Sequence, residues 1–510
     1  MKHLIYSLNN IWTIVIFLAF VIVGLLLIFP LYNIFVASFL DNETGVFTLQ
    51  NYTNILGRRY YRTAIYNSVI VGLSSMVGAL IIGIPLAFFT SRYNIKGKSL
   101  ISTLAILALV SPPFIGAYAW ITMLGSNGWL RLGLESMGIS MPTIYGPLGI
   151  ILVFSLKFYP FVFLLTAGAI RTINVSLEEA AESLGCRPFS KFMRVTLPII
   201  FPAVSTGALL AFVLSLADFG TPSIIGRNFR VLSTLAYNLF TSEMGGNPGL
   251  ASTVSILLIL VSLIFVYIQR RLIRKKDYGS DMLRRPEVKQ LSRVSSIPVH
   301  VLCYLIVFLS SLPSLVVIYN SFRKTSGPVF KSGFGLDSYR RIINDVPDAI
   351  FNSFVFSISA VLMIVALGTL IGYTVARKPS ILTGFLDSLL MIPYIVPGVV
   401  LGLGFIVSFN SKPVVLVGTA TIIILVIFVR RLPYSVRSSV SILKQISLGV
   451  EEAAISLGAS PAKTFLKVTL PLMMPGVFAG AMMAFITAIN ELSSSIILQK
   501  YNINQPQYNL

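Results

Sequence analysis

Long uninterrupted runs of apolar residues constrain this chain more than any other feature of its sequence. An α-helix needs roughly 20 apolar residues to cross the hydrocarbon core of a bilayer. Eleven stretches approach that length: Ile11–Val36, Ala64–Thr90, Leu100–Met123, Pro147–Ile170, Ile199–Ala217, Leu250–Ile268, Ile297–Tyr319, Ile350–Ala376, Phe385–Phe409, Pro413–Val429 and Leu472–Ile489. Because these runs do not alternate with polar residues, they predict helices rather than barrel strands. We therefore expect an all-α polytopic membrane protein with eleven spans.

The positive charge is distributed unevenly between the loops that join these stretches. The net charge is +21, and 25 of the 39 Lys and Arg residues fall at the N-terminus or in one alternating set of loops. Cytoplasmic loops carry such an excess, so we place the N-terminus in the cytoplasm of a multi-pass protein of the cell (inner) membrane. This distribution indicates contact with membrane lipid and argues against nucleic acid as a partner.

Cysteine and histidine are too sparse to build a reactive site. Cys186 falls in a cytoplasmic loop and Cys303 in a span, so no disulfide is expected, and the two histidines, His3 and His300, form no cluster. No metal site is assigned from these residues. The first apolar run is longer than the roughly 7–15 residues of a signal-peptide core, so it is interpreted as a retained anchor.

An internal repeat organises the chain. Residues 178–198 read EEAAESLGCRPFSKFMRVTLP, and residues 451–471 read EEAAISLGASPAKTFLKVTLP, at an offset of 273. Further upstream the offset is 285, where Arg92 matches Arg377, and a longer outside loop at Gly125–Gly146 explains the change. Both copies lie in cytoplasmic loops, so the two halves run in parallel about an axis along the membrane normal.

The repeat divides the chain into two similar halves of about six helices each. We predict a first half at 1–268 with its repeated loop at 171–198, a basic cytoplasmic linker at 269–296, and a second half at 297–510 with its loop at 431–471. After the second copy only a polar tail remains, QKYNINQPQYNL, so the second half lacks the mate of the sixth span and the C-terminus is expected outside. That helix is dispensable, is supplied by another polypeptide, or lies beyond a shortened sequence, and the last alternative is favoured.

Each repeated loop is expected to form a helix, a tight turn and a second helix. Leu177, Ala181 and Leu184 lie at i, i+4 and i+7, which makes one apolar stripe. Gly185 and Gly458 stand where a helix ends in a left-handed residue. Small alanines beside the stripe would allow a partner to approach closely.

These loops resemble the cytoplasmic signature of permease subunits in ATP-binding-cassette importers: Glu-Ala-Ala, three residues, Gly, then Leu-Pro. Two copies in one chain resemble the fused permeases of the iron(III) importer group. The resemblance implies that each loop seats in one of two copies of a cytoplasmic ATPase, and that an extracytoplasmic binding protein delivers the solute. ATP and Mg²⁺ would then be used by the ATPase, with no cofactor bound by this chain. The implied docking residues are Glu179, Ala180, Ala181, Gly185, Glu452, Ala453, Ala454 and Gly458. The alternative is an interfacial hairpin that packs only on its own spans.

Ionisable residues within the apolar stretches are candidates for a solute pathway, because they are costly in lipid. Asp218 and Glu491 are repeat mates that either line the pathway or form solvated span ends. Lys157 is expected to reach a cytoplasmic interface and is given no role. Prolines interrupt two corresponding spans and mark either a gate or a packing kink: Pro112, Pro113, Pro393 and Pro397.

The function classes are narrowed by what the sequence contains and lacks. It has no phosphate loop of the GxxxxGK[ST] type, so this chain is not expected to be an enzyme. A secondary transporter driven by an ion gradient also has parallel repeats but would not need duplicated docking loops. A membrane scaffold would not need the repeat. The solute expected from the resemblance is iron(III), with thiamine, a polyamine or a phosphonate as alternatives.

Overall fold

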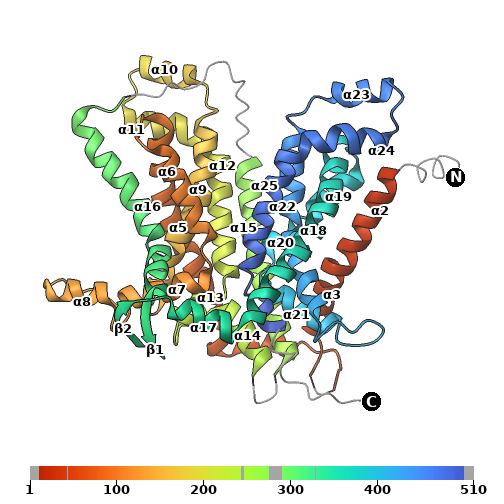
Figure 1. The fold of residues 1–510 in the computed structure, drawn as a ribbon, viewed down its shortest axis with the longest axis horizontal. Helices are drawn as coiled ribbons and strands as arrows, with labels where there is room; N and C mark the ends of the chain where they lie inside the picture. The colour runs from red at the N-terminus through yellow and green to blue at the C-terminus, as the bar shows by residue number, and fades with distance from the viewer. Residues whose placement is uncertain (1–10, 43, 243–245, 275–289, 328, 499–510) are drawn as a thin grey trace. The chain divides into compact units, whose positions relative to one another are not determined.

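The computed structural model describes residues 11–42, 44–242, 246–274, 290–327 and 329–498, and these are almost entirely helical (Figure 1). The one sheet in the described part is an antiparallel hairpin of β1 (Arg323–Ser326) and β2 (Val329–Phe334). The polar tail at 499–510 and the middle of the predicted linker lie outside the described residues. The chain forms two compact units, each described by itself.

The first of these, the N-half unit, comprises Thr53–Leu235 and Leu257–Arg341. Three long helices form its centre by packing against one another: α5 (Arg59–Arg92), α9 (Pro147–Ile170) and α12 (Leu197–Ala217). Close approach of α12 to α9 requires Gly207, because a methyl group there would come within 2.7 Å of the Cα of Val162. Small residues at such crossings are typical of helix packing in membranes.

Shorter helices complete the N-half unit around that centre. The remaining helices with their bounds are α6 (Lys98–Val110), α7 (Pro113–Leu124), α8 (Trp129–Ser136), α10 (Val175–Ser183), α11 (Pro188–Lys191), α13 (Gly220–Ile225) and α16 (Arg293–Ser321). The chain bends by 102° between α6 and the segment that begins with α7, at the predicted break at Pro112 and Pro113. Helix α13 packs against α7.

The other unit, the C-half unit, comprises Met1–Tyr52, Ala236–Ile256 and Ile342–Leu510. Its centre is again three long helices: α18 (Pro347–Arg377), α22 (Ala420–Leu443) and α25 (Leu470–Ile489). The broken span is α19 (Ile381–Leu389), α20 (Ile392–Ile395) and α21 (Gly398–Ser408), with a 107° bend before α21. Helix α23 (Leu448–Ser456) and the short α24 (Pro461–Thr464) lie between α22 and α25 in the chain. Four helices lie partly in both sets of residues: α4 (Gln50–Gly57), α14 (Leu232–Thr241), α15 (Pro248–Arg274) and α17 (Asp337–Asp345).

The internal repeat predicted from the sequence reappears in the helix contacts. At the offset of 273, Gly207 and Val162 correspond to Gly480 and Ser435. A methyl group at Gly480 would lie 3.1 Å from the Cα of Ser435, so the same crossing is made through a glycine in both units. The matched sequences therefore build the same three-helix centre twice.

The first helix of each half packs on the core of the other half. In the C-half unit, α2 (Ile11–Val23) contacts α18 and α19, and α3 (Phe29–Ala37), joined to α2 by the π turn η1 (Gly24–Ile28), contacts α21. Trp12 of α2 packs on Tyr373 of α18 with ring centroids 4.2 Å apart. In the N-half unit, α16 packs against α6 and α7.

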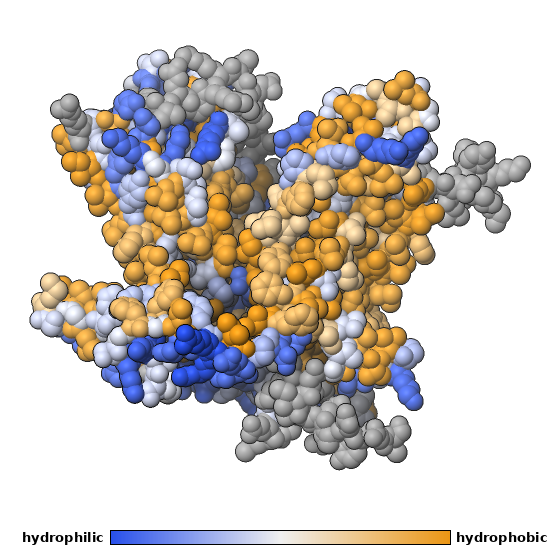
Figure 2. All heavy atoms as spheres, in the orientation of Figure 1, coloured by the Kyte–Doolittle hydropathy of each residue, from blue (hydrophilic) through white to orange (hydrophobic). Residues whose placement is uncertain are grey.

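Lipid-facing apolar surface covers the flanks of the long helices within each unit, whereas hydrophilic side chains gather near their ends (Figure 2). Phe17 of α2 and Phe308 of α16 are among the exposed large apolar side chains. Such a surface is what a membrane span presents to acyl chains, where burial in protein is not required.

The predicted count of eleven spans is not confirmed. By length and hydropathy, eight helices of the described residues could cross a membrane, or ten if each bent pair is one span. Within the predicted span Pro413–Val429, helix begins only at Ala420, as the start of α22, which continues to Leu443 and carries Arg430 and Arg431. Residues 431–443, expected in the second loop, therefore belong to a helix that is shielded by α18 and α25.

A substitution of Gly207 by Ala tests the α9–α12 crossing. The added methyl group overlaps the backbone of α9, so we expect roughly 1–3 kcal/mol of lost stability and a lower Tm of the detergent-solubilised protein. Gly168→Ala on α9 is the matched control, because a methyl group at Gly168 meets nothing within 4 Å. Equal Tm values for the two variants would contradict this packing.

Candidate functional site

The two repeated loops have the helix–turn–helix form predicted from their sequences. Helix α10 begins after Asn174, whose side chain accepts a hydrogen bond from the Ser176 N–H, and Ser447 caps α23 in the same way. The turns are made by Gly185 at φ +81° and Gly458 at φ +84°. The prediction of a left-handed glycine at both positions is confirmed.

The second helix of each loop runs on into the membrane helix without a break. Ser460 caps α24 through the Lys463 N–H, whereas Arg187 provides no side-chain cap for α11. A π turn, η2 (Phe192–Thr196) or η3 (Phe465–Thr469), joins each short helix to α12 or α25. A proline follows both π turns, and the wider turn accommodates a residue that has no N–H to donate.

A buried ion pair fastens each loop to the end of a long helix. In the N-half unit, Arg92 Nη2 at the end of α5 donates to Glu178 Oε1 at 2.6 Å, and Thr196 Oγ1 donates to the same oxygen at 2.7 Å. In the C-half unit, Arg377 Nε of α18 donates to Glu451 Oε1 at 2.9 Å. Sequence reasoning missed both pairs, although Arg92 and Arg377 were already matched by the repeat.

These contacts divide the candidate docking residues into an outer and an inner set. The structure exposes Glu179, Ala180, Gly185, Glu452, Ala453 and Gly458. It buries Ala181 against its own unit and half-buries Ala454. The inner alanines lie on the same side of their helices as the tethered Glu178 and Glu451, so they pack on their own chain.

The predicted apolar stripe of the first loop is divided at the helix end. Ala181 is 7% exposed, whereas Leu184 is 86% exposed. Leu184 is the residue after α10, and its repeat mate Leu457, after α23, is 89% exposed. Two matched leucines in water at the tip of a loop are apolar surface available to a partner.

The carboxylates predicted within the membrane part are buried and ion-paired. In the N-half unit, Asp218 follows the last residue of α12 and lies 3.1 Å from Lys157 Nζ of α9. Asp218 also accepts a hydrogen bond from the Thr221 N–H at 2.9 Å. The alternative of a solvated span end does not fit a side chain that is 5% exposed. The expectation that Lys157 reaches an interface was wrong, because its ammonium group turns inward to Asp218.

The C-half unit repeats this pair with one more cation. Glu491 follows α25, is 2% exposed, and is in ion contact with Arg430 and Arg431 of α22. At the offset of 273, Lys157 matches Arg430 and Asp218 matches Glu491. Arg431 falls in the loop predicted at 431–471, because the apolar run stops at Val429 while the helix does not.

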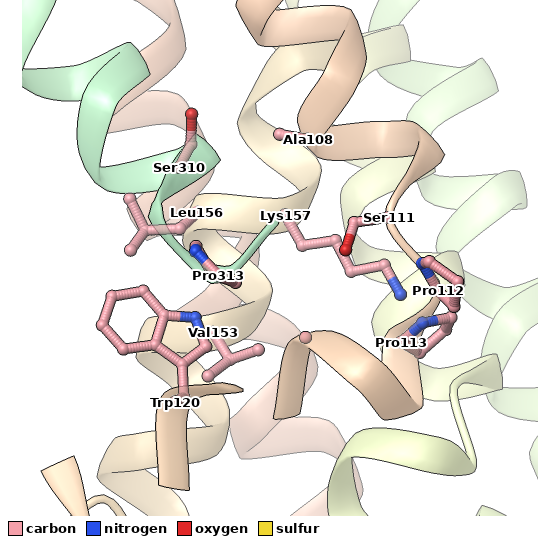
Figure 3. Close-up of a pocket in the computed structure, with 11 residues that line it drawn as sticks. Ala108, Ser111, Pro112, Pro113, Trp120, Val153, Leu156, Lys157, Ser310 and Pro313 are labelled. Atoms are coloured by element: carbon pink, nitrogen blue, oxygen red, sulfur yellow. The ribbon is translucent and has the colours of Figure 1, made fainter. Parts of the chain in front are cut away.

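A small pocket lies beside the broken span of the N-half unit (Figure 3). Ser111, Pro112 and Pro113 from the break line one side, and Lys157 extends toward them. Ser310 and Pro313 of α16 contribute to the wall, so the first helix of the second half also lines this pocket of the N-half unit. Both the predicted break at Pro112 and Pro113 and the inward-turned Lys157, which was not predicted, therefore line this pocket.

A cluster of metal-binding side chains among the described residues would be a further candidate site. No group of three or more His, Cys, Asp or Glu side chains that could hold a metal ion is found within them. Asp387, the remaining intramembrane carboxylate, lies 3.1 Å from Arg437.

Comparison with known proteins identifies the family. The chain matches the family described as binding-protein-dependent transport system inner membrane component over residues 79–278 and 365–506. These two segments make up more than half of the chain, and each contains one repeated loop. The chain belongs to this family, as a fused, two-half permease of the ATP-binding-cassette importer type.

Two relatives that match 92% of this chain are named for ferric transport. The chain is 29% identical over 484 residues to the ferric transport system permease protein FbpB of Actinobacillus pleuropneumoniae, which covers 92% of this chain and 69% of the relative. It is 28% identical over 482 residues to the putative ferric transport system permease protein FbpB 1 of Haemophilus influenzae, covering 92% and 75%. The molybdenum transport system permease protein ModB of Mycobacterium tuberculosis is 31% identical over 206 residues, covering 40% of this chain and 77% of the relative.

Loss of one tether should loosen one loop only. In Arg377→Gln, Glu451 stays buried without its cation, a change that typically costs about 3–5 kcal/mol. We expect amide hydrogen exchange of α23 to rise by about tenfold or more, while α10, which keeps its Arg92, serves as the control within the same molecule. Lys378→Gln, at the exposed neighbouring residue, should leave both helices unchanged. Equal exchange of α23 in the two variants would show that the ion pair does not hold the loop.

Proposed function

We propose that this chain is the membrane permease of an ATP-driven iron(III) importer. It receives the metal from an extracytoplasmic binding protein and is powered by two copies of a cytoplasmic ATP-binding-cassette ATPase. ATP and Mg²⁺ act in the ATPase, and the permease contributes no catalytic residue. The N-terminus and both repeated loops lie on the cytoplasmic side of the inner membrane.

The observation that carries this proposal is the matched exposed surface of the two loops. In each copy, the Glu-Ala pair after the tethered glutamate, the left-handed glycine and the leucine before it are exposed together. The buried ion pair beneath them holds the helix on its unit, so a force on the exposed side reaches α5 or α18 through a charged contact. Two such surfaces fit two copies of one ATPase.

The assignment of iron(III) rests on the relatives that match along the whole chain. The two relatives described above that match 92% of this chain are named as ferric permeases, and each match spans both halves. The relative named for molybdenum matches less than half of this chain, so it supports the transport class more than the solute. Uptake of radioactive iron by cells that express the complete transporter is the direct measurement.

Substitution of the turn glycines tests the docking of the ATPase. Gly185→Val and Gly458→Val place a β-branched residue in the left-handed region, which costs roughly 1–2 kcal/mol locally and displaces the exposed face of the loop. We expect each variant to remain in the membrane, to lose co-purification with the ATPase, and to lose ⁵⁵Fe uptake.

Gly138→Val is a matched control for this experiment. Gly138 has the same φ of +81° as Gly185, and a side chain at either position meets nothing within 4 Å. The control suffers the same backbone strain outside the loops, at the end of α8, so it should keep the ATPase and ⁵⁵Fe uptake. ATPase association at the normal level in both loop variants would refute the docking assignment.

A further inference from the structure

A buried cation stands beside the broken span of each half at the same position of the repeat. Lys157 of α9 lines the pocket at Pro112 and Pro113, directly before α7. Its mate Arg430 of α22 lies at the start of α21, because a methyl group at Gly398 would come within 2.5 Å of Arg430 Nη1. Each cation therefore faces the N-terminus of the helix that follows a bend.

The carboxylates near these cations are already engaged. Asp218 accepts from Lys157 and from the Thr221 N–H. Glu491 is in contact with two arginines and also accepts from the Ser494 N–H and Oγ at 3.2 and 3.0 Å. A bare metal cation that entered either cluster would have to compete with these partners and would meet the positive charge beside them. The clusters are poorly suited to a free cation.

The C-half cluster carries more positive charge than its carboxylate neutralises. Two guanidinium groups face one carboxylate, and Arg430 and Arg431 are only 11% and 18% exposed in their side chains. The buried Nε of each arginine has no hydrogen-bond acceptor among the described residues. Buried donors without an acceptor are costly, so an arriving acceptor would be stabilised.

Helix dipoles add to this positive potential. Helix α21 has 11 residues and α7 has 12, and both begin at the bend with N–H groups that have no intrahelical acceptor. A helix N-terminus favours negative charge, and a guanidinium group matches the geometry of an oxyanion. Discontinuous membrane helices use their N-termini in this way toward anionic groups.

We propose that these two clusters bind a polyvalent oxyanion during transport, with Arg430 and Arg431 as the stronger site and Lys157 as its counterpart. This inference rests on the proposed permease function and names the chemical class of its solute: an anionic oxygen-donor complex that encloses iron(III), or, in place of iron(III), a free oxyanion. In both cases the arginines contact the oxygen atoms of the anion and not the metal.

Direct binding to the purified full-length chain tests the proposal without the ATPase. The probes are [³²P]phosphate, [⁹⁹Mo]molybdate, [¹⁴C]citrate without iron, and ⁵⁵Fe(III) in excess citrate, each measured by equilibrium dialysis in detergent. We expect at least one probe to bind, and Arg430→Gln to weaken its binding by about tenfold or more, as for a lost charged hydrogen bond. Arg430→Gln leaves Arg431 to neutralise Glu491, so the fold should survive.

Two further single variants should change probe binding differently from Arg430→Gln: one should strengthen it and the other should leave it unchanged. Glu491→Gln removes the competing carboxylate and should strengthen binding of the same probe. Arg437→Gln, on the same helix but paired with Asp387, should leave binding unchanged. For the first half, Lys157→Gln combined with Asp218→Asn removes the cation without stranding a carboxylate, and should weaken binding less than Arg430→Gln.

The probes distinguish the two sources of the oxyanion. Binding of phosphate, molybdate or iron-free citrate identifies a free oxyanion, and binding of ⁵⁵Fe citrate alone identifies an iron(III) complex; both support the proposal. It is overturned if every probe binds equally to wild type, Arg430→Gln and Glu491→Gln, if none binds, or if [¹⁴C]spermidine binds and Arg430→Gln strengthens that binding. Failure of ATPase docking would overturn the proposed function and leave these binding results standing.

Discussion

The ion pairs Arg92–Glu178 and Arg377–Glu451 connect the two repeated loops with the long helices that cross the membrane. Each removes two charges from water, and that loss is compensated only because further hydrogen bonds complete the pair. Thr196 donates to Glu178, and Tyr373 donates to Glu451 at 2.8 Å. The loop helix is thereby fixed in orientation, with Ala181 or Ala454 facing inward and the leucine after the helix facing outward. The exposed surface of each loop, which we propose as the docking surface, depends on this buried arrangement.

The features that the sequence predicted well are those set by backbone chemistry. Gly185 and Gly458 had to be left-handed because a helix ended there, and adjacent prolines at 112 and 113 had to interrupt a span. The repeat itself was visible because identical contacts require similar residues, as at Gly207 and Gly480. These are local rules, and they hold without knowledge of the neighbours.

The features that the sequence did not predict depend on partners far along the chain. Hydropathy ended a span at Val429, but α22 continues through Arg430 and Arg431, and both arginines are in ion contact with Glu491, which is far along the chain. The same reasoning sent Lys157 to an interface, since nothing local indicates that Asp218 lies 3.1 Å away. The repeat held a signal for these ion pairs. Asp218 matches Glu491, and Lys157 matches Arg430, so each half has one carboxylate and one cation at matched positions.

The exchange of first helices has a consequence for biosynthesis. Ser310 and Pro313 on α16 form part of the pocket wall in the N-half unit, and Tyr304 of α16 donates to the carbonyl of Lys96 at 2.7 Å. The ribosome makes α16 only after all the other membrane helices of that unit have been synthesised. The early helices must therefore wait in the membrane with an unfilled flank, while α2, made first, waits for α18. The N-half unit cannot finish folding before α16 of the second half is translated, and α2 of the first half cannot pack before α18 is made. Joining the two halves in one polypeptide therefore supplies each unit with its missing helix in equal number and at the right time.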